Sequence, residues 1–331
     1  TAIGHASVYT GSVPAIHGIA GNDFIEQKTG TPMYCVGDST VQPVGTASAA
    51  GKMSPKNLLT TTVTDELKLA TNFRSKIIGI SIKDRGAILP AGHAADAAYW
   101  LDGATGNWIT STWYMKELPE WVKKLNEEKL VDKYLQQDWN TLYPGDTYLQ
   151  STADLNAYET PYKGAKEAVF PVRLSELAKT NGRGIISSTP FGNTLTLTMA
   201  KRAVENENLG KNTVPDFLAI SLSSTDYVGH QFGTNSVEVE DTYLRLDKDL
   251  ADFFDFLDTQ VGKGNYTVFL TADHGAPHNP KLLNDHGLPG GWFSNASLLK
   301  EANAFLEKKY GQHKIIRSLA NNEVHLDYTL I

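Results

Sequence analysis

Cysteine is nearly missing from this chain of 331 residues, because Cys35 is its single cysteine. An intrachain disulfide and a thiolate metal cluster are therefore excluded. The sequence also lacks a glycine-rich dinucleotide turn, so it offers no ligands or motif for haem, iron–sulfur or flavin cofactors. No apolar run approaches the roughly 20 residues that span a bilayer, and we expect no membrane partner.

Positive charge is also in short supply. The chain has 30 Lys and Arg residues against 37 Asp and Glu residues, a net charge of −7 and a pI near 5.7. The basic residues are scattered rather than grouped, so we expect no nucleic acid duplex as a partner. The charge does not exclude small phosphate esters as ligands. We expect the chain to be a monomer.

The beginning of the sequence has neither a methionine nor the basic and apolar regions of a signal peptide. It opens abruptly at Thr1-Ala2-Ile3-Gly4-His5, which looks like a cut into a longer protein. The length and a hydrophobic content of 41% are sufficient for one large α/β domain. We therefore expect 1–331 to form a single domain, with an insert near 113–175.

Strand-like and helix-like patterns alternate along the chain. Apolar runs predict strands at 76–82, 98–101, 108–112, 216–222 and 266–270. Helical spacing or composition predicts helices at 4–11, 118–142, 191–209, 237–259 and 297–310. The stretch 143–172 is rich in Pro, Tyr, Thr and Gly, which is typical of irregular surface or a cap. This order predicts an α/β fold with a doubly wound, mostly parallel sheet flanked by helices.

Two acid–histidine pairs follow apolar runs. Asp226 and His230 lie in Ser-Ser-Thr-Asp-Tyr-Val-Gly-His, and Asp273 and His274 lie in Phe-Leu-Thr-Ala-Asp-His-Gly. Both pairs should emerge at strand carboxyl ends, where ligand sites of α/β sheets gather. The spacing of four lets Asp226 and His230 project from one helical turn. Carboxylate and imidazole donors suit Zn²⁺ or a similar ion, whereas the alternative is a solvated acid beside a loop histidine.

Two divalent ions close together suit hydrolytic displacement at phosphorus. The motifs Asp-Tyr-Val-Gly-His and Ala-Asp-His-Gly resemble the metal motifs of the alkaline phosphatase superfamily. The stretch 1–22 is similar to the threonine-nucleophile, phosphate-irrepressible (PafA-type) alkaline phosphatases, which are related to nucleotide pyrophosphatase/phosphodiesterases. This likeness runs in register over essentially the whole chain.

The resemblance implies roles for four residues. Thr1 matches the nucleophile that forms a covalent phosphoryl-enzyme, and Asn22 matches an amide donor to a phosphoryl oxygen. Lys83 and Arg85 match two cations that contact a phosphate monoester; a strand spacing of two would put both on one face. Without the resemblance, Asn22 is typical of a turn and the two cations of solvated surface charge. The related diesterases lack this Lys-x-Arg pair, which favours monoesters.

The resemblance also implies two Zn²⁺ ions. Asp273 and His274 would bind the ion that activates Thr1, and Asp226 and His230 the ion at the leaving-group oxygen. The family adds an upstream aspartate and a downstream histidine, and this chain has neither position, so it looks incomplete at both ends. Four histidines are too near Asp273 in sequence to be that last ligand: His278, His286, His313 and His325. The remaining His5 and His17 are expected to be packing donors, and His93 has no assigned role.

The preferred hypothesis is a metal-dependent phosphomonoesterase, and the resemblance implies a periplasmic or secreted enzyme that scavenges phosphate. The nearest alternative is a phosphodiesterase or nucleotide pyrophosphatase on the same fold. A second alternative is an N-terminal threonine hydrolase that uses the α-amine of Thr1 as its base. The third is a truncated relative that binds metal or phosphate without turnover.

Overall fold

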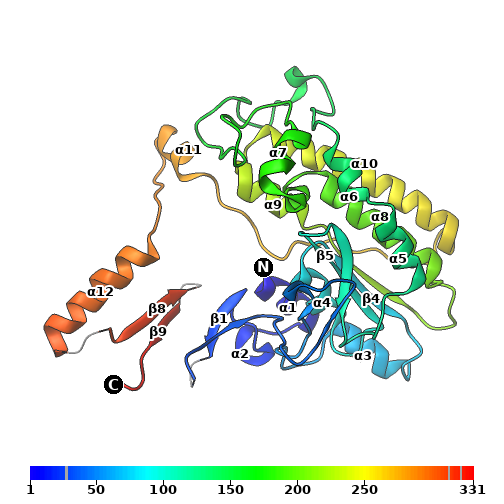
Figure 1. The fold of residues 1–331 in the computed structure, drawn as a ribbon, viewed down its shortest axis with the longest axis horizontal. Coiled ribbons are helices and arrows are strands. Elements are labelled where there is room, and N and C mark those ends of the chain that lie inside the picture. Colours follow the sequence, from blue (N-terminus) through cyan, green and yellow to red (C-terminus); the bar gives the residue numbers. More distant parts are fainter. Residues whose placement is uncertain (27–28, 312–313, 321–322) are drawn as a thin grey trace.

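A five-stranded sheet forms the centre of the computed structural model, which describes residues 1–26, 29–311, 314–320 and 323–331 (Figure 1). Its strand order is β3-β6-β5-β4-β7, with β3 Pro43–Val44, β6 Asn107–Ser111, β5 Ala97–Asp102, β4 Ile77–Ser81 and β7 Phe217–Ser221. Strand β4 runs parallel to both β5 and β7, and β6 runs antiparallel to β5 and β3. The predicted α/β sheet flanked by helices is confirmed.

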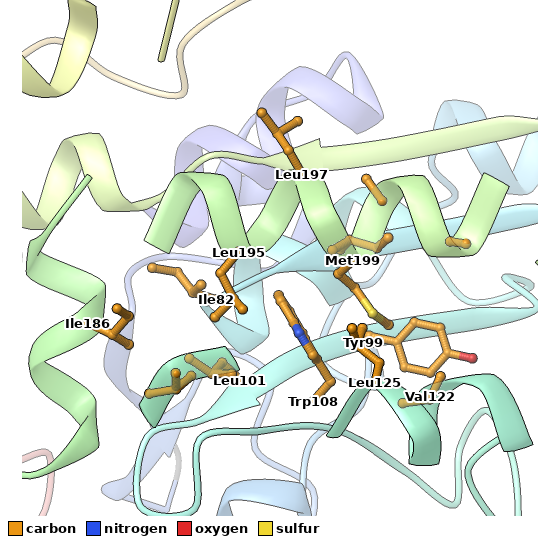
Figure 2. Packing of buried hydrophobic residues seen from close by; sticks show 14 of the residues in the cluster. Ile82, Tyr99, Leu101, Trp108, Val122, Leu125, Ile186, Leu195, Leu197 and Met199 are labelled. Atoms are coloured by element: carbon orange, nitrogen blue, oxygen red, sulfur yellow. The ribbon is translucent and has the colours of Figure 1, made fainter. Parts of the chain in front are cut away.

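Alternating residues of β5 face two separate hydrophobic clusters. Tyr99 and Leu101 belong to the larger cluster, whereas Ala98 and Trp100 belong to the smaller one. This alternation follows from the two-residue side-chain period of a strand. Figure 2 shows the larger cluster, in which Trp108 lies among aliphatic side chains of the sheet and its covering helices. Burial of each such side chain contributes on the order of 2 kcal/mol.

Helices cover both faces of the sheet. On one face lie α1 (Ala2–Thr10) and α4 (Asp84–Ala91), and on the other α8 (Phe191–Asn206), α9 (Ser224–Phe232) and α10 (Val237–Leu257). The further helices are α2 Pro14–His17, α3 Val63–Ala70, α5 Glu120–Glu127, α6 Leu130–Leu135, α7 Leu174–Asn181, α11 Pro280–Asp285 and α12 Asn295–Tyr310. Two antiparallel hairpins complete the fold: β1 Asp23–Glu26 with β2 Thr31–Tyr34, and β8 Ile316–Ala320 with β9 Glu323–Leu326.

The predicted helices at 191–209, 237–259 and 297–310 correspond to α8, α10 and α12 within a few residues. The predicted helix at 118–142 is wrong in its extent. Lys129 adopts φ 51°, in the left-handed region, and separates α5 from α6. Beyond α6 the chain is mostly irregular up to α7.

One buried carboxylate fixes this irregular segment. Asp241 of α10 accepts hydrogen bonds from Trp139 Nε1 at 2.7 Å, Leu142 N at 2.6 Å and Tyr148 Oη at 2.5 Å. Arg245 Nε donates to the same carboxylate at 2.6 Å. The segment 139–148 is therefore tied to α10, although it has little secondary structure of its own. Whether 113–175 is an insert in a single incomplete domain stays a prediction.

The predicted strand at 266–270 is wrong. This run has no regular structure in the described chain, and Val268, Phe269 and Leu270 are 49%, 65% and 78% exposed. Phe269 packs edge-on against Phe217 of β7 at 5.9 Å between ring centroids. The run lies beside the sheet, but no strand of the described chain pairs with it, and a strand needs a ladder partner to satisfy its backbone.

The carboxyl-terminal part of the chain extends away from the sheet, as Figure 1 shows for α12 and the β8–β9 hairpin. No residue of α12 is buried. Within the described residues, no helix combines the length and the apolar composition that a membrane crossing requires.

Candidate active site

The predicted site residues meet where β4 and β7 end. Strand β4 ends at Ser81 and leads to Lys83, and β7 ends at Ser221 and leads into α9 with Asp226 and His230. Ser81, the last residue of β4, bonds to Ser223, two residues after β7, with 3.0 Å between their Oγ atoms. The predicted helical turn for Asp226 and His230 is confirmed. Asp273 does not follow a strand, so that part of the prediction is wrong.

The Asp226 carboxylate is the meeting point of three cationic or imidazole groups. Lys83 Nζ forms an ion pair with its Oδ2. His230 Nε2 lies 3.3 Å and His274 Nε2 lies 3.4 Å from its Oδ1. Burial alone would raise the pKa of Asp226, but hydrogen bonds from His230 and Lys83 outweigh it and hold that pKa below the usual range.

Asp273 lies directly against the start of α1. Its Oδ2 pairs with the α-amine of Thr1 and lies 3.6 Å from His5 Nε2 and 3.8 Å from His274 Nε2. This approach requires a glycine in α1, because a Cβ at Gly4 would be 2.0 Å from the Asp273 carbonyl oxygen. Burial lowers the pKa of His5 to about 4 despite the neighbouring carboxylate. His274 thus lies between the two carboxylates.

The side chains of Thr1 and Asn22 both accept backbone hydrogen bonds at the amino terminus of α1. Thr1 is the N-cap residue, and its Oγ1 accepts a hydrogen bond from Gly4 N at 3.2 Å. Asn22 Oδ1 accepts from Ala2 N at 2.9 Å, and within the described residues no hydrogen bond of its amide nitrogen is recorded. Both side chains therefore lie at the positive end of a helix dipole, a favourable place for an anion.

Lys83 and Arg85 are not solvated surface charges. Lys83 is only 8% exposed, and its Nζ lies 4.1 Å from the centroid of the Tyr227 ring. Arg85 Nη1 donates to Tyr34 Oη at 3.0 Å. The expected strand spacing is wrong, because Lys83 caps α4 and Arg85 lies in its first turn. Burial lowers the pKa of Lys83, which the Asp226 carboxylate opposes.

The donor set is suited to divalent cations, although it is small. Two carboxylates and two imidazoles converge, and each carboxylate already attracts an ammonium group in the structure. Among the described residues, no group of three or more His, Cys, Asp or Glu side chains is arranged to hold one ion. An ion held by one carboxylate and one imidazole of this set would need further ligands to complete a four-coordinate site.

The remaining histidines have contacts of their own. His17 is buried between Ser7 Oγ at 3.1 Å and Ile19 N at 3.1 Å, which agrees with a packing role. His278 bonds Asn235 Oδ1 at 2.8 Å, and His286 bonds Leu282 O at 2.9 Å. His325 lies 3.5 Å from Glu323 on the β8–β9 hairpin. His313 is outside the described residues.

Sequence reasoning missed four side chains that line this cluster. His5 contacts Asp273, and Tyr227 contacts Lys83, as described above. Asp84 and Tyr34 complete the surroundings of Arg85, with Tyr34 Oη donating to Asp84 Oδ1 at 2.6 Å. Tyr227 lies inside the motif Asp-Tyr-Val-Gly-His, and Asp84 lies between Lys83 and Arg85. These positions could have indicated that both residues line the site. Tyr34 carries no such signal, because it comes from the β1–β2 hairpin.

Comparisons with known proteins agree with this architecture. The model of the type I phosphodiesterase / nucleotide pyrophosphatase family matches residues 1–329, and the chain belongs to this family. It is 59% identical over 291 residues to alkaline phosphatase PhoV of Synechococcus elongatus and 52% identical over 330 residues to alkaline phosphatase PafA of Elizabethkingia meningoseptica. It is also 62% identical over 333 aligned residues to a Myroides odoratus protein named calcium-transporting ATPase.

Solved structures give the same relationship. A crystal structure of wild-type alkaline phosphatase PafA superimposes with a TM-score of 0.96 at 51% identity, covering 100% of this chain and 63% of that one. The alignments cover 88%, 99% and 100% of this chain for PhoV, PafA and the Myroides protein. The chain spans only 52%, 60% and 61% of the lengths of these three relatives.

Proposed function

We propose that this chain is part of a metal-dependent phosphatase that hydrolyses small phosphate monoesters through a phosphothreonine at Thr1. The observation that carries the proposal is the ion pair of Lys83 with Asp226 beside the contact of Asp273 with the start of α1, with Arg85 two residues from Lys83 in the first turn of α4. The names of PhoV and PafA as alkaline phosphatases support it. A solved PafA variant has replacements at a threonine, an asparagine, a lysine and an arginine, the residue types of Thr1, Asn22, Lys83 and Arg85.

Each proposed residue has a chemical task. Asp273 and His274 would hold one ion, and Asp226 and His230 the other. Such ions, when bound, lower the pKa of a nearby hydroxyl and stabilise the charge on a leaving oxygen. We take them to be Zn²⁺, because carboxylate and imidazole donors suit this metal. Asn22, Lys83 and Arg85 would donate hydrogen bonds to the non-bridging phosphoryl oxygens.

The reaction proceeds in two displacements. A bond forms between Thr1 Oγ1 and phosphorus as the ester oxygen–phosphorus bond breaks, the threonine proton passes to solvent, and the departing oxygen takes up a proton to leave as an alcohol. Water then attacks the phosphothreonine, which releases inorganic phosphate and restores the hydroxyl. By analogy with the alkaline phosphatases it resembles, we infer that the protein acts in the periplasm or outside the cell in phosphate scavenging.

Replacing the nucleophile without removing the helix cap gives the sharpest test. Thr1→Asn keeps a good N-cap residue but has no hydroxyl, and Thr1→Ser keeps both. On an aryl phosphate monoester, we expect the wild type to turn over with about two divalent ions per chain by plasma mass spectrometry. Thr1→Asn should lose activity by on the order of 10³-fold or more, whereas Thr1→Ser retains measurable turnover.

The same samples separate the alternatives. Full activity in Thr1→Asn would exclude the phosphothreonine. Acetylation of the α-amine would abolish an N-terminal threonine hydrolase and spare the phosphatase. Lys83→Ala and Arg85→Ala should reduce the rate on a monoester more than on a diester, and equal losses would instead favour the phosphodiesterase that the family name suggests. Metal binding without turnover would indicate a binding relative.

A further inference from the structure

Arg85 is held by a network that comes from two separate parts of the fold. Tyr34 Oη accepts a hydrogen bond from Arg85 Nη1 at 3.0 Å and donates to Asp84 Oδ1 at 2.6 Å. The same Asp84 oxygen accepts from Arg85 N at 2.6 Å. The side chains of Arg85 and Asp84 are each 17% exposed, so little solvent competes for these bonds. One edge of the guanidinium is thus fixed by protein groups.

The segment that carries Tyr34 also contacts Asn22. Cys35 N donates to Asn22 O at 2.8 Å. Asn57 Nδ2 anchors this segment by donating to Tyr34 O at 3.2 Å and to Cys35 O at 3.3 Å. Residues 34–35 therefore connect Asn22 and Arg85, two of the residues that we propose to bind the phosphoryl group.

We propose that Tyr34 and Asp84 are positioning residues that orient Arg85 toward the phosphoryl group and thereby favour dianionic phosphate monoesters over diesters. The proposal rests on the proposed function. An arginine side chain has many rotamers, and fixing it beforehand avoids the entropy cost of ordering it when the substrate binds. Tyr227 is a second hydrogen-bond partner of Arg85, and the N–H groups that neither tyrosine uses can donate to non-bridging oxygens. A monoester gains most, because it has three such oxygens and two charges to share between Lys83 and Arg85.

The test is a double-mutant cycle with Tyr34→Phe and Arg85→Ala, read by calorimetric binding of inorganic phosphate and by turnover of an aryl phosphate monoester and a methyl aryl phosphate diester. Tyr34→Phe keeps the packed ring and removes only the hydroxyl. We expect it to weaken phosphate binding and monoester kcat/KM about tenfold, in keeping with one hydrogen bond to a charged group. The diester rate should change much less, and no further loss should occur in the Arg85→Ala background.

Tyr114→Phe is the matched control. Tyr114 packs against the same smaller hydrophobic cluster as Tyr34, and its buried hydroxyl has no hydrogen-bond partner among the described residues. Its loss should leave phosphate binding and the monoester-to-diester ratio unchanged. In Asp84→Asn the retained acceptor oxygen should preserve most of the selectivity, which Asp84→Ala should lose.

The outcomes separate this inference from the proposed function. Equal losses on monoester and diester, or the same loss in the Arg85→Ala background, would show that Tyr34 has only a structural role. Unchanged phosphate binding in Tyr34→Phe would overturn the inference at any level of turnover. Phosphate binding that depends on Tyr34 and Arg85 without turnover would overturn the proposed function and keep the positioning network. A wild-type chain that binds no phosphate would overturn both.

Discussion

Two buried carboxylates on one face of α10 have opposite surroundings. Asp241 accepts four hydrogen bonds, whereas Glu238, fully buried one turn earlier, has no donor to either oxygen among the described residues. Burial raises the pKa of Glu238 to about 8, and the negative charge of Glu159 raises it further. Burial also raises the pKa of Glu159, to about 7. A charge that is paired can remain buried, and one that is unpaired takes up a proton instead. We therefore expect Glu238 to be mostly protonated in the folded protein at neutral pH.

Glu238→Gln should stabilise the protein only at higher pH. The folded-state pKa of about 8 lies above the ordinary value of 4.5, so the wild type loses stability as pH rises from 4.5 through 8. In urea unfolding, the two proteins should have similar free energies of unfolding at pH 5. At pH 8 the variant should be more stable by up to about 3 kcal/mol.

Asp241→Asn is the matched control, and we expect it to destabilise the protein at both pH values, since it weakens four existing bonds. A Glu238→Gln difference that stayed constant between pH 5 and pH 8 would mean that Glu238 is ionised in the folded state.

At the scale of elements, the close contact between β4 and α4 positions the start of the site. A Cβ at Gly79 in β4 would be 2.2 Å from the Ala87 carbonyl oxygen and 2.9 Å from the Ala91 Cβ. The backbone of the helix therefore fills the space of the missing side chain. Lys83 and Arg85 lie at the start of α4. The packing of α4 against β4 therefore fixes the backbone positions of both residues.

Gly79→Ala should force α4 away from β4 and reduce the free energy of unfolding by about 2 to 3 kcal/mol, as overpacked cores do. Gly229→Ala in α9 is the control, because nothing lies within 4 Å of the added Cβ and alanine is the better helix former. It should raise stability by about 0.5 to 1 kcal/mol. Chemical denaturation of both variants checks the pair, and equal stability of Gly79→Ala and the wild type would mean that α4 can shift at no cost.

Elements and site residues differ in how far the sequence predicts them. The pairing of Asp226 with His230 was predictable because a spacing of four is local to one helical turn. The contact of Tyr34 with Arg85 joins positions 51 residues apart, and no local pattern carries it. The run 266–270 has strand composition, yet strand formation depends on a partner that composition does not reveal. The roles of Thr1, Asn22, Lys83 and Arg85 come from family resemblance rather than from periodicity, and they stay a prediction.

At the scale of the whole molecule, the regions with buried aromatic side chains are separate from the regions with exposed ones. The largest buried side chains, Trp100, Trp108 and Trp139, lie in the body of the fold, whereas Trp292 and Phe293 are 82% and 74% exposed. The segment around them has no regular structure between α11 and α12. Few buried apolar contacts mean that such a segment opens at little free-energy cost.

Brief chymotrypsin treatment should therefore cut first after Trp292 or Phe293. The irregular segment 139–148 should be cut later, because its hydrogen bonds to Asp241 protect it even though Tyr143 is 41% exposed. Mass spectrometry of the first fragments gives the order of cleavage. Earlier cleavage at Tyr143 would show that the Asp241 bonds do not hold this segment.

The position of the single cysteine has a practical consequence. Cys35 is fully buried in the smaller cluster, and burial raises the pKa of its thiol to about 12. Thiolate is the reactive form, so alkylating dyes should leave this residue untouched in the folded chain. This chain of 331 residues can thus take a cysteine at any exposed position and be labelled there alone. Dye pairs placed on α12 and on the body could then follow how these two parts move relative to each other in solution.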